Sequence, residues 1–157
     1  MEEAPPDLAA QPAAPSSTTP ALTGPIVLYD GLCGFCDASV QWILRTDTSA
    51  RYRFAALQGD TAAAILARHP EIPQGLDSIL LVEPDGTGER VSWHSAAIFR
   101  LCAGLPGPWR ALAWLGFLPR FLTDLGYRAF ARIRYLVWGR RESCRIPSPG
   151  ERARFLP

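Results

Sequence analysis

Residues 26–36 read Ile-Val-Leu-Tyr-Asp-Gly-Leu-Cys-Gly-Phe-Cys, a short apolar run followed by a glycine-containing turn and two cysteines. The apolar run favours a buried strand, and the helical pattern from residue 34 places both cysteines at the start of a helix. Unpaired N–H groups and the helix dipole at that position favour the thiolate, the reactive form in disulfide exchange. The stretch therefore predicts a dithiol redox centre, with Cys33 as nucleophile and Cys36 as resolving thiol.

Three other roles fit a Cys-x-x-Cys pair. A zinc site needs two further ligands, and the remaining candidates, Cys102, Cys144, His69 and His94, are far apart in the sequence. A structural disulfide that closes so small a loop would stabilise the fold little. Two buried, unreactive cysteines on a helix are the third alternative.

Asp30 has two possible roles. It stands before Gly31 and three residues before Cys33, where its carboxylate can cap the turn. It can also act as a proton acceptor or relay for the thiols. Both roles remain open from the sequence.

Strand and helix patterns alternate after residue 25. The predicted strands are Ile26–Tyr29, Tyr52–Leu57, Ser78–Glu83 and Glu89–Trp93, and the predicted helices are 34–46, Asp60–Ala67 and 95–103, with Asp60 and Ser95 as N-caps. Pro84-Asp85-Gly86 predicts a hairpin turn. This is the element order of the thioredoxin fold, an α/β fold with a mixed sheet, in which a right-handed crossover makes the first two strands parallel.

Asp30, Cys33 and Cys36 also form the D-x-x-C-x-x-C signature of the DCC family of thiol-disulfide oxidoreductases, which resemble thioredoxin-like proteins. The resemblance extends over about residues 26–157, with further landmarks at 52–59, 107–110, 119–120, 131–132 and 144–147. Thioredoxin-like enzymes usually carry a cis-proline before the hairpin. Here Leu76-Asp77-Ser78 stand at that place, so a trans peptide is expected.

The chain divides into three parts by composition. Residues 1–25 contain six prolines and predict a disordered Pro/Ala-rich tail, 26–104 the thioredoxin-like core, and 105–157 an Arg- and aromatic-rich helical extension packed on that core. The net charge of +1 hides an asymmetry: residues 1–99 carry five Arg and twelve acidic residues, whereas 100–157 carry eleven Arg and three. With neither a secretory signal nor a long apolar stretch, the sequence predicts a cytoplasmic protein.

The extension has an apolar stripe at helical spacing. Leu122, Leu125, Ile133 and Leu136 lie on it, and we expect them to be buried against the sheet. The alternative is a basic, aromatic-edged surface that contacts an anionic membrane or a partner. Cys102 is interpreted as a core residue, and Cys144 as a possible third redox thiol.

Together these patterns predict a thiol-disulfide oxidoreductase with Cys33, Cys36 and Asp30 at its site. No cofactor or metal is indicated. The expected partners are a protein or small-molecule disulfide substrate, an unidentified reductant and a weakly bound membrane surface, without nucleic acid, for which no recognition motif is present. The alternative is a non-enzymatic membrane- or protein-docking module whose cysteines are structural or bind metal.

Overall fold

The computed structural model describes residues 24–73, 75, 78–86, 88–139 and 147–157. Almost all of the predicted N-terminal tail lies outside these ranges, as do Cys144 and the Leu76-Asp77 pair. The side chain of Leu136 also lies outside the description. The predictions for these residues are therefore untested.

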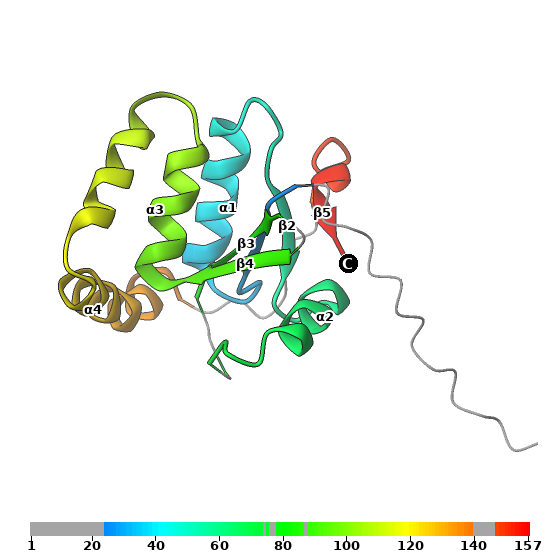
Figure 1. The fold of residues 1–157 in the computed structure, drawn as a ribbon. Coiled ribbons are helices and arrows are strands. Elements are labelled where there is room, and N and C mark those ends of the chain that lie inside the picture. Colours follow the sequence, from blue (N-terminus) through cyan, green and yellow to red (C-terminus); the bar gives the residue numbers. More distant parts are fainter. Residues whose placement is uncertain (1–23, 74, 76–77, 87, 140–146) are drawn as a thin grey trace, which may run out of the picture.

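The described residues form one mixed sheet with strand order β4-β3-β1-β2-β5 (Figure 1). Its strands are β1 (Ile26–Tyr29), β2 (Arg53–Ala56), β3 (Leu80–Asp85), β4 (Gly88–Trp93) and β5 (Phe155–Leu156). The helices are α1 (Gly34–Thr46), α2 (Asp60–Arg68), α3 (His94–Gly104) and α4 (Arg120–Trp138), with 3-10 segments η1 (Gly107–Phe117) and η2 (Arg152–Arg154). β1 runs parallel to β2 and antiparallel to β3, so the predicted thioredoxin-like α/β fold is confirmed.

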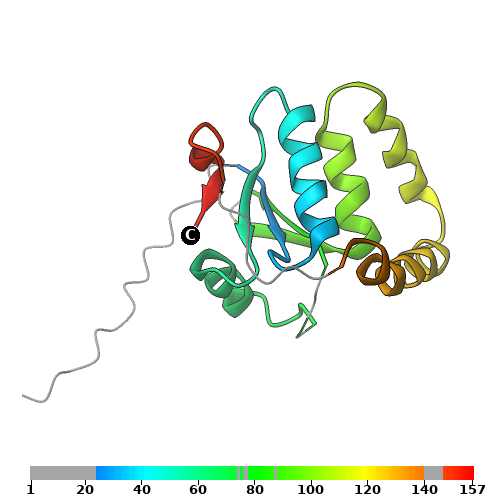
Figure 2. The same cartoon turned by 180° about the vertical axis from the view of Figure 1, so that it is seen from behind.

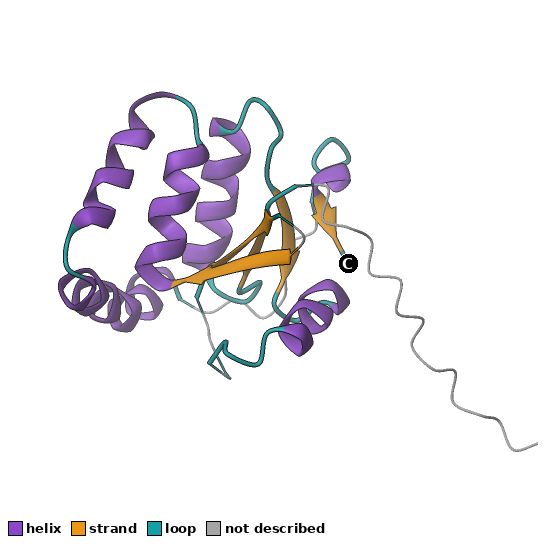
Figure 3. Ribbon diagram, in the orientation of Figure 1, coloured by secondary structure: helices purple, strands orange, loops and turns teal. Residues whose placement is uncertain are grey.

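Helices cover both faces of the sheet (Figure 3). Val27 and Tyr29 of β1 pack in one cluster with side chains of α1 and α3. Ile26 and Leu28 belong to the opposite cluster, which includes α2. This alternation follows from the period of two in a strand, and it makes β1 the centre of both halves of the core.

Two helix starts differ from the prediction. Gly59 is the N-cap of α2 and Trp93 that of α3, and neither makes a side-chain capping bond. Asp60 and His94 are therefore already helical, and the predicted caps at Asp60 and Ser95 were wrong. Strand pairing shifts the second boundary, because β4 stays paired with β3 through Trp93 and the chain enters α3 directly.

α4 crosses the N-terminal ends of α1 and α3, as both Figure 1 and Figure 2 show. Its inner side contacts these helices rather than the sheet. Leu122, Leu125 and Ile133 remain about half exposed or more. The expectation that they are buried against the sheet was wrong, because helical spacing shows that a face is apolar but not what covers it.

A partly buried ion pair attaches the segment after residue 147 to the core. Arg154 donates to the Asp47 carboxylate (2.5 Å) and to the Tyr52 carbonyl (3.0 and 3.1 Å). Burial opposes ionisation of Asp47, but hydrogen bonds from surrounding N–H groups and the charge of Arg154 outweigh it, so the pKa of the carboxyl lies below its ordinary value. The next residues pair in parallel with β2 as β5, an edge strand that the sequence analysis missed.

Arg154→Leu should therefore lower the free energy of unfolding by about 2–4 kcal/mol, because it leaves the buried Asp47 carboxylate without its cation. The matched control is Arg152→Leu, two residues away and exposed, which should change stability by no more than about 0.5 kcal/mol. Urea unfolding measures both. Equal stability of the two variants would contradict the importance of the ion pair.

Candidate active site

The turn after β1 is fixed by Asp30. Its carboxylate Oδ1 accepts a hydrogen bond from the backbone N–H of Leu32 (3.0 Å), and its carbonyl accepts one from the N–H of Cys33 (3.2 Å). The side chain is only 4% exposed. Asp30 therefore caps the turn that leads into α1, which is the first of its two predicted roles.

Gln58 is a second support of this turn. Its Nε2 donates to Asp30 Oδ1 (2.9 Å), and its Oε1 accepts from the N–H of Gly31 (3.2 Å). Sequence reasoning did not single out this glutamine as a site residue. The signal was the strand register: Tyr29 pairs with Ala56 in parallel, so the second residue after each strand lies at the same edge of the sheet.

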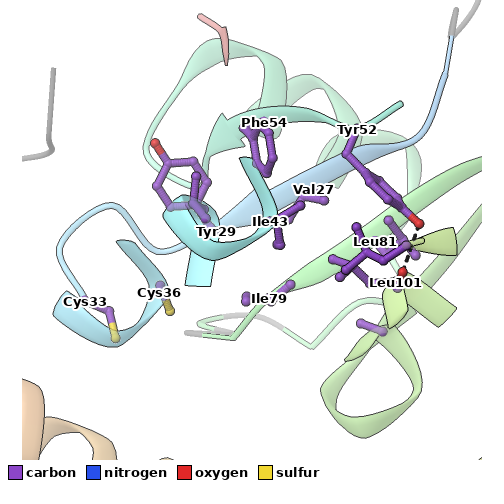
Figure 4. Packing of buried hydrophobic residues seen from close by; sticks show 13 residues of the cluster. Val27, Tyr29, Cys33, Cys36, Ile43, Tyr52, Phe54, Ile79, Leu81 and Leu101 are labelled. Atoms are coloured by element: carbon purple, nitrogen blue, oxygen red, sulfur yellow. Dashed lines mark hydrogen bonds between the residues drawn. The ribbon is translucent and has the colours of Figure 1, made fainter. Parts of the chain in front are cut away.

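Cys33 and Cys36 lie at the first turn of α1. Cys33 is the N-cap, with an extended backbone (φ −90°, ψ 117°), and its carbonyl accepts the N–H of Asp37 (3.0 Å). Neither cysteine is in a disulfide, and their sulfur atoms point to the same side of the helix start (Figure 4). The structure thus brings Asp30, Cys33 and Cys36 together at the end of β1.

Both cysteines are inaccessible to solvent, with exposed fractions of 0% for Cys33 and 1% for Cys36. The ring of Phe35, between them in sequence, meets Phe130 of α4 edge to face at 4.7 Å between centroids. α4 is also joined to the start of α3 by a hydrogen bond from Ser95 to Thr123 (3.3 Å). α4 therefore covers this end of the molecule, and we call this helix the roof of the site.

An apolar cavity of about 320 Å³ lies under this roof, between α1, α3 and α4. Cys36 is part of its wall. The other side chains that line it are mainly aromatic or aliphatic and include Phe35, Ile98, Phe99, Tyr127 and Phe130. Cys36 thus faces a space with room for an apolar group.

Cys102 and His69, two candidate ligands in the zinc alternative, lie in other surroundings. Cys102 is buried in α3, where burial raises the pKa of its thiol and favours the protonated form. His69 lies between Glu71 (2.8 Å) and Glu89 (3.0 Å), and these carboxylates outweigh burial and raise its pKa. Within the described ranges, no three His, Cys, Asp or Glu side chains are grouped as metal ligands. Nor is any described helix long and apolar enough to cross a membrane.

The DCC1-like thiol-disulfide oxidoreductase family matches residues 27–140, a range that runs from β1 through α4. The chain belongs to this family. It is 32% identical over 132 residues to the uncharacterized protein YuxK of Bacillus subtilis (strain 168), covering 84% of this chain and 93% of YuxK. It is 33% identical over 123 residues to the DCC family protein At1g52590, chloroplastic, of Arabidopsis thaliana, covering 78% and 69%. No solved structure matches the chain.

Substitution of Asp30 tests whether its carboxylate stabilises the turn before α1. Asp30→Ala should lower the free energy of unfolding by about 1–3 kcal/mol, because it removes the acceptor of two hydrogen bonds. Asp30→Asn keeps the Oδ1 acceptor and should cost less than about 1 kcal/mol. Asp60→Ala, at an exposed aspartate without a capping bond, is the control for loss of a helix-start carboxylate. The turn-capping role fails if Asp30→Ala is as stable as Asp30→Asn.

Proposed function

We propose that the protein catalyses thiol–disulfide exchange through Cys33 and Cys36. The observation that carries this proposal is a pair of thiols, not joined in a disulfide, at the start of α1, with Cys33 at the N-cap. The start of a helix is the positive end of its dipole, and the Asp30–Gln58 network holds the turn that leads into this helix. Membership of a family named for this chemistry supports a redox role.

The proposed reaction begins when the Cys33 thiolate attacks one sulfur of a substrate disulfide. A Cys33–substrate bond forms, the substrate S–S bond breaks, and the other substrate sulfur leaves as a thiolate. The Cys36 thiolate then attacks the Cys33 sulfur and releases the second substrate thiol. Two electrons and two protons pass to the substrate, and the Cys33–Cys36 disulfide is returned to the dithiol by an external reductant.

Access to the thiols requires a local movement, because both sulfurs are buried. We place this movement at the contact between Phe35 and Phe130 of α4, next to Cys36 in the sequence and in the cavity wall. The opening exposes the apolar cavity beside Cys36, which favours a substrate with an apolar group next to its disulfide. Two predictions belong to this proposal. The substrate is a protein or small-molecule disulfide, and the compartment is the cytoplasm.

The dithiol can be tested on the full chain. Treatment with oxidised glutathione should yield a form lighter by two hydrogens, and the reduced form should cleave a disulfide-bridged reporter peptide. Cys33→Ser should abolish cleavage, and Cys36→Ser should accumulate a mixed disulfide with the peptide. Cys102→Ser is the matched control, a buried cysteine outside the pair, and should retain activity. Mass spectrometry reads both the oxidised form and the trapped adduct.

Two outcomes would overturn the proposal. One is reporter cleavage by Cys33→Ser at the rate of the natural chain. The other is stoichiometric zinc in the purified protein that is lost on Cys33→Ser, since thiolates held by zinc would make the pair a structural metal site.

The roof has its own test. Phe130→Ala should raise the rate at which iodoacetamide alkylates Cys33 by roughly two- to tenfold, because an aromatic pair contributes about 0.5–1.5 kcal/mol to the closed state. Phe121→Ala, on the exposed side of the same helix, is the control and should leave the rate unchanged. Labelling followed by peptide mass spectrometry separates Cys33 from Cys36. Equal rates in the two variants would show that α4 does not control access.

A further inference from the structure

Large hydrophobic side chains are exposed on one continuous stretch of this chain. Among the described residues, every exposed large hydrophobic lies between Trp109 and Val137. They are Trp109, Leu112, Trp114, Leu115, Phe117, Leu118, Phe121, Leu122, Leu125, Ile133 and Val137. Isolated exposed apolar residues are ordinary, but a concentration of this size marks an interaction surface.

The two sides of α4 have different surroundings. Thr123, Tyr127 and Phe130 contact α3 or α1 and line the cavity. Phe121, Leu125 and Ile133 recur at spacings of four and eight and share another side, where they are 75%, 63% and 51% exposed. Trp114 and Phe117 of η1 are exposed by 74% and 83% and contact each other (5.7 Å between ring centroids). Within the described ranges, this apolar side of α4 therefore stays exposed.

The charge of this segment is strongly positive. Residues 107–138 contain five arginines, no lysine and one acidic residue, Asp124. Arg110, Arg128 and Arg132 are exposed. Residues 1–99, in contrast, carry a net charge of −7 from five Arg and twelve acidic residues. An apolar face with arginine at its edge matches a surface that is both apolar and negatively charged.

We propose that residues 107–138, the η1–α4 segment, dock the protein on the surface of an anionic lipid bilayer, with the exposed apolar side chains in the headgroup–acyl boundary and the arginines on lipid phosphates. A second copy of this chain is a poorer complement, because a symmetric contact would place the same arginines against each other. The docking does not depend on the redox chemistry. It brings the roof of the dithiol site to the membrane surface.

Vesicle co-sedimentation of the full chain tests this proposal. The probes are phosphatidylcholine vesicles with and without phosphatidylglycerol, at low and high salt. The natural chain should bind the anionic vesicles and lose binding as salt screens the arginines. Phe121→Ser with Leu125→Ser should weaken binding about tenfold or more by removing buried apolar area. Arg128→Gln with Arg132→Gln should weaken it roughly tenfold or more at low salt.

Arg45→Gln with Arg53→Gln is the charge-matched control. It also removes two exposed arginines, but from α1 and β2, outside the η1–α4 segment. It should change vesicle binding by less than about twofold. Circular dichroism and reactivity of Cys33 confirm that each variant is folded. The proposal is overturned if the folded natural chain does not bind anionic vesicles, if both arginine pairs have the same effect, or if the chain forms a dimer that the Phe121/Leu125 substitutions dissociate.

Discussion

Complete burial of β1 is the constraint on which the rest of the structure depends. All four of its side chains are buried, and it is hydrogen-bonded to β2 on one edge and β3 on the other. A buried aliphatic or aromatic side chain contributes about 1.5–3 kcal/mol, so the strand can be placed in only one register without large losses. That register sends Val27 and Tyr29 toward α1 and α3 and leaves Asp30 at the end of the strand, where the turn to the cysteines begins.

The site is consequently held by backbone geometry and by a small polar network. Asp30 and Gln58 join the ends of two parallel strands, and they hold the turn that leads to Cys33, the N-cap of α1. α4 adds a different element. It meets α1 through the Phe35–Phe130 ring pair and α3 through the Ser95–Thr123 hydrogen bond, and it lines the cavity beside Cys36. A helix held by side-chain contacts and not by strand pairing can open without breaking the sheet.

Much of the core follows from local sequence patterns. The buried strand at 26–29, the helix at 34–46 and the dithiol position rest on strong short-range signals: an apolar run, a glycine turn and helical spacing. The pairing of β5 with β2 has no such signal, because two residues give no periodicity and their partners lie about a hundred positions earlier. Gln58 was missed for a related reason, as its role depends on strand register. The stripe at Leu122, Leu125 and Ile133 was identified correctly as apolar, but a stripe is the same whether a sheet or another surface covers it.

The late position of β5 in the chain has a consequence for synthesis on the ribosome. β2 leaves the ribosome about a hundred residues before the strand that covers its outer edge and the arginine that pairs with Asp47. While those residues are being added, the nascent chain carries an uncovered sheet edge and an acidic group whose cation has not yet emerged. Exposed edges pair readily with other chains, so this interval of synthesis is the one in which the sheet is most open to pairing with a neighbouring nascent chain.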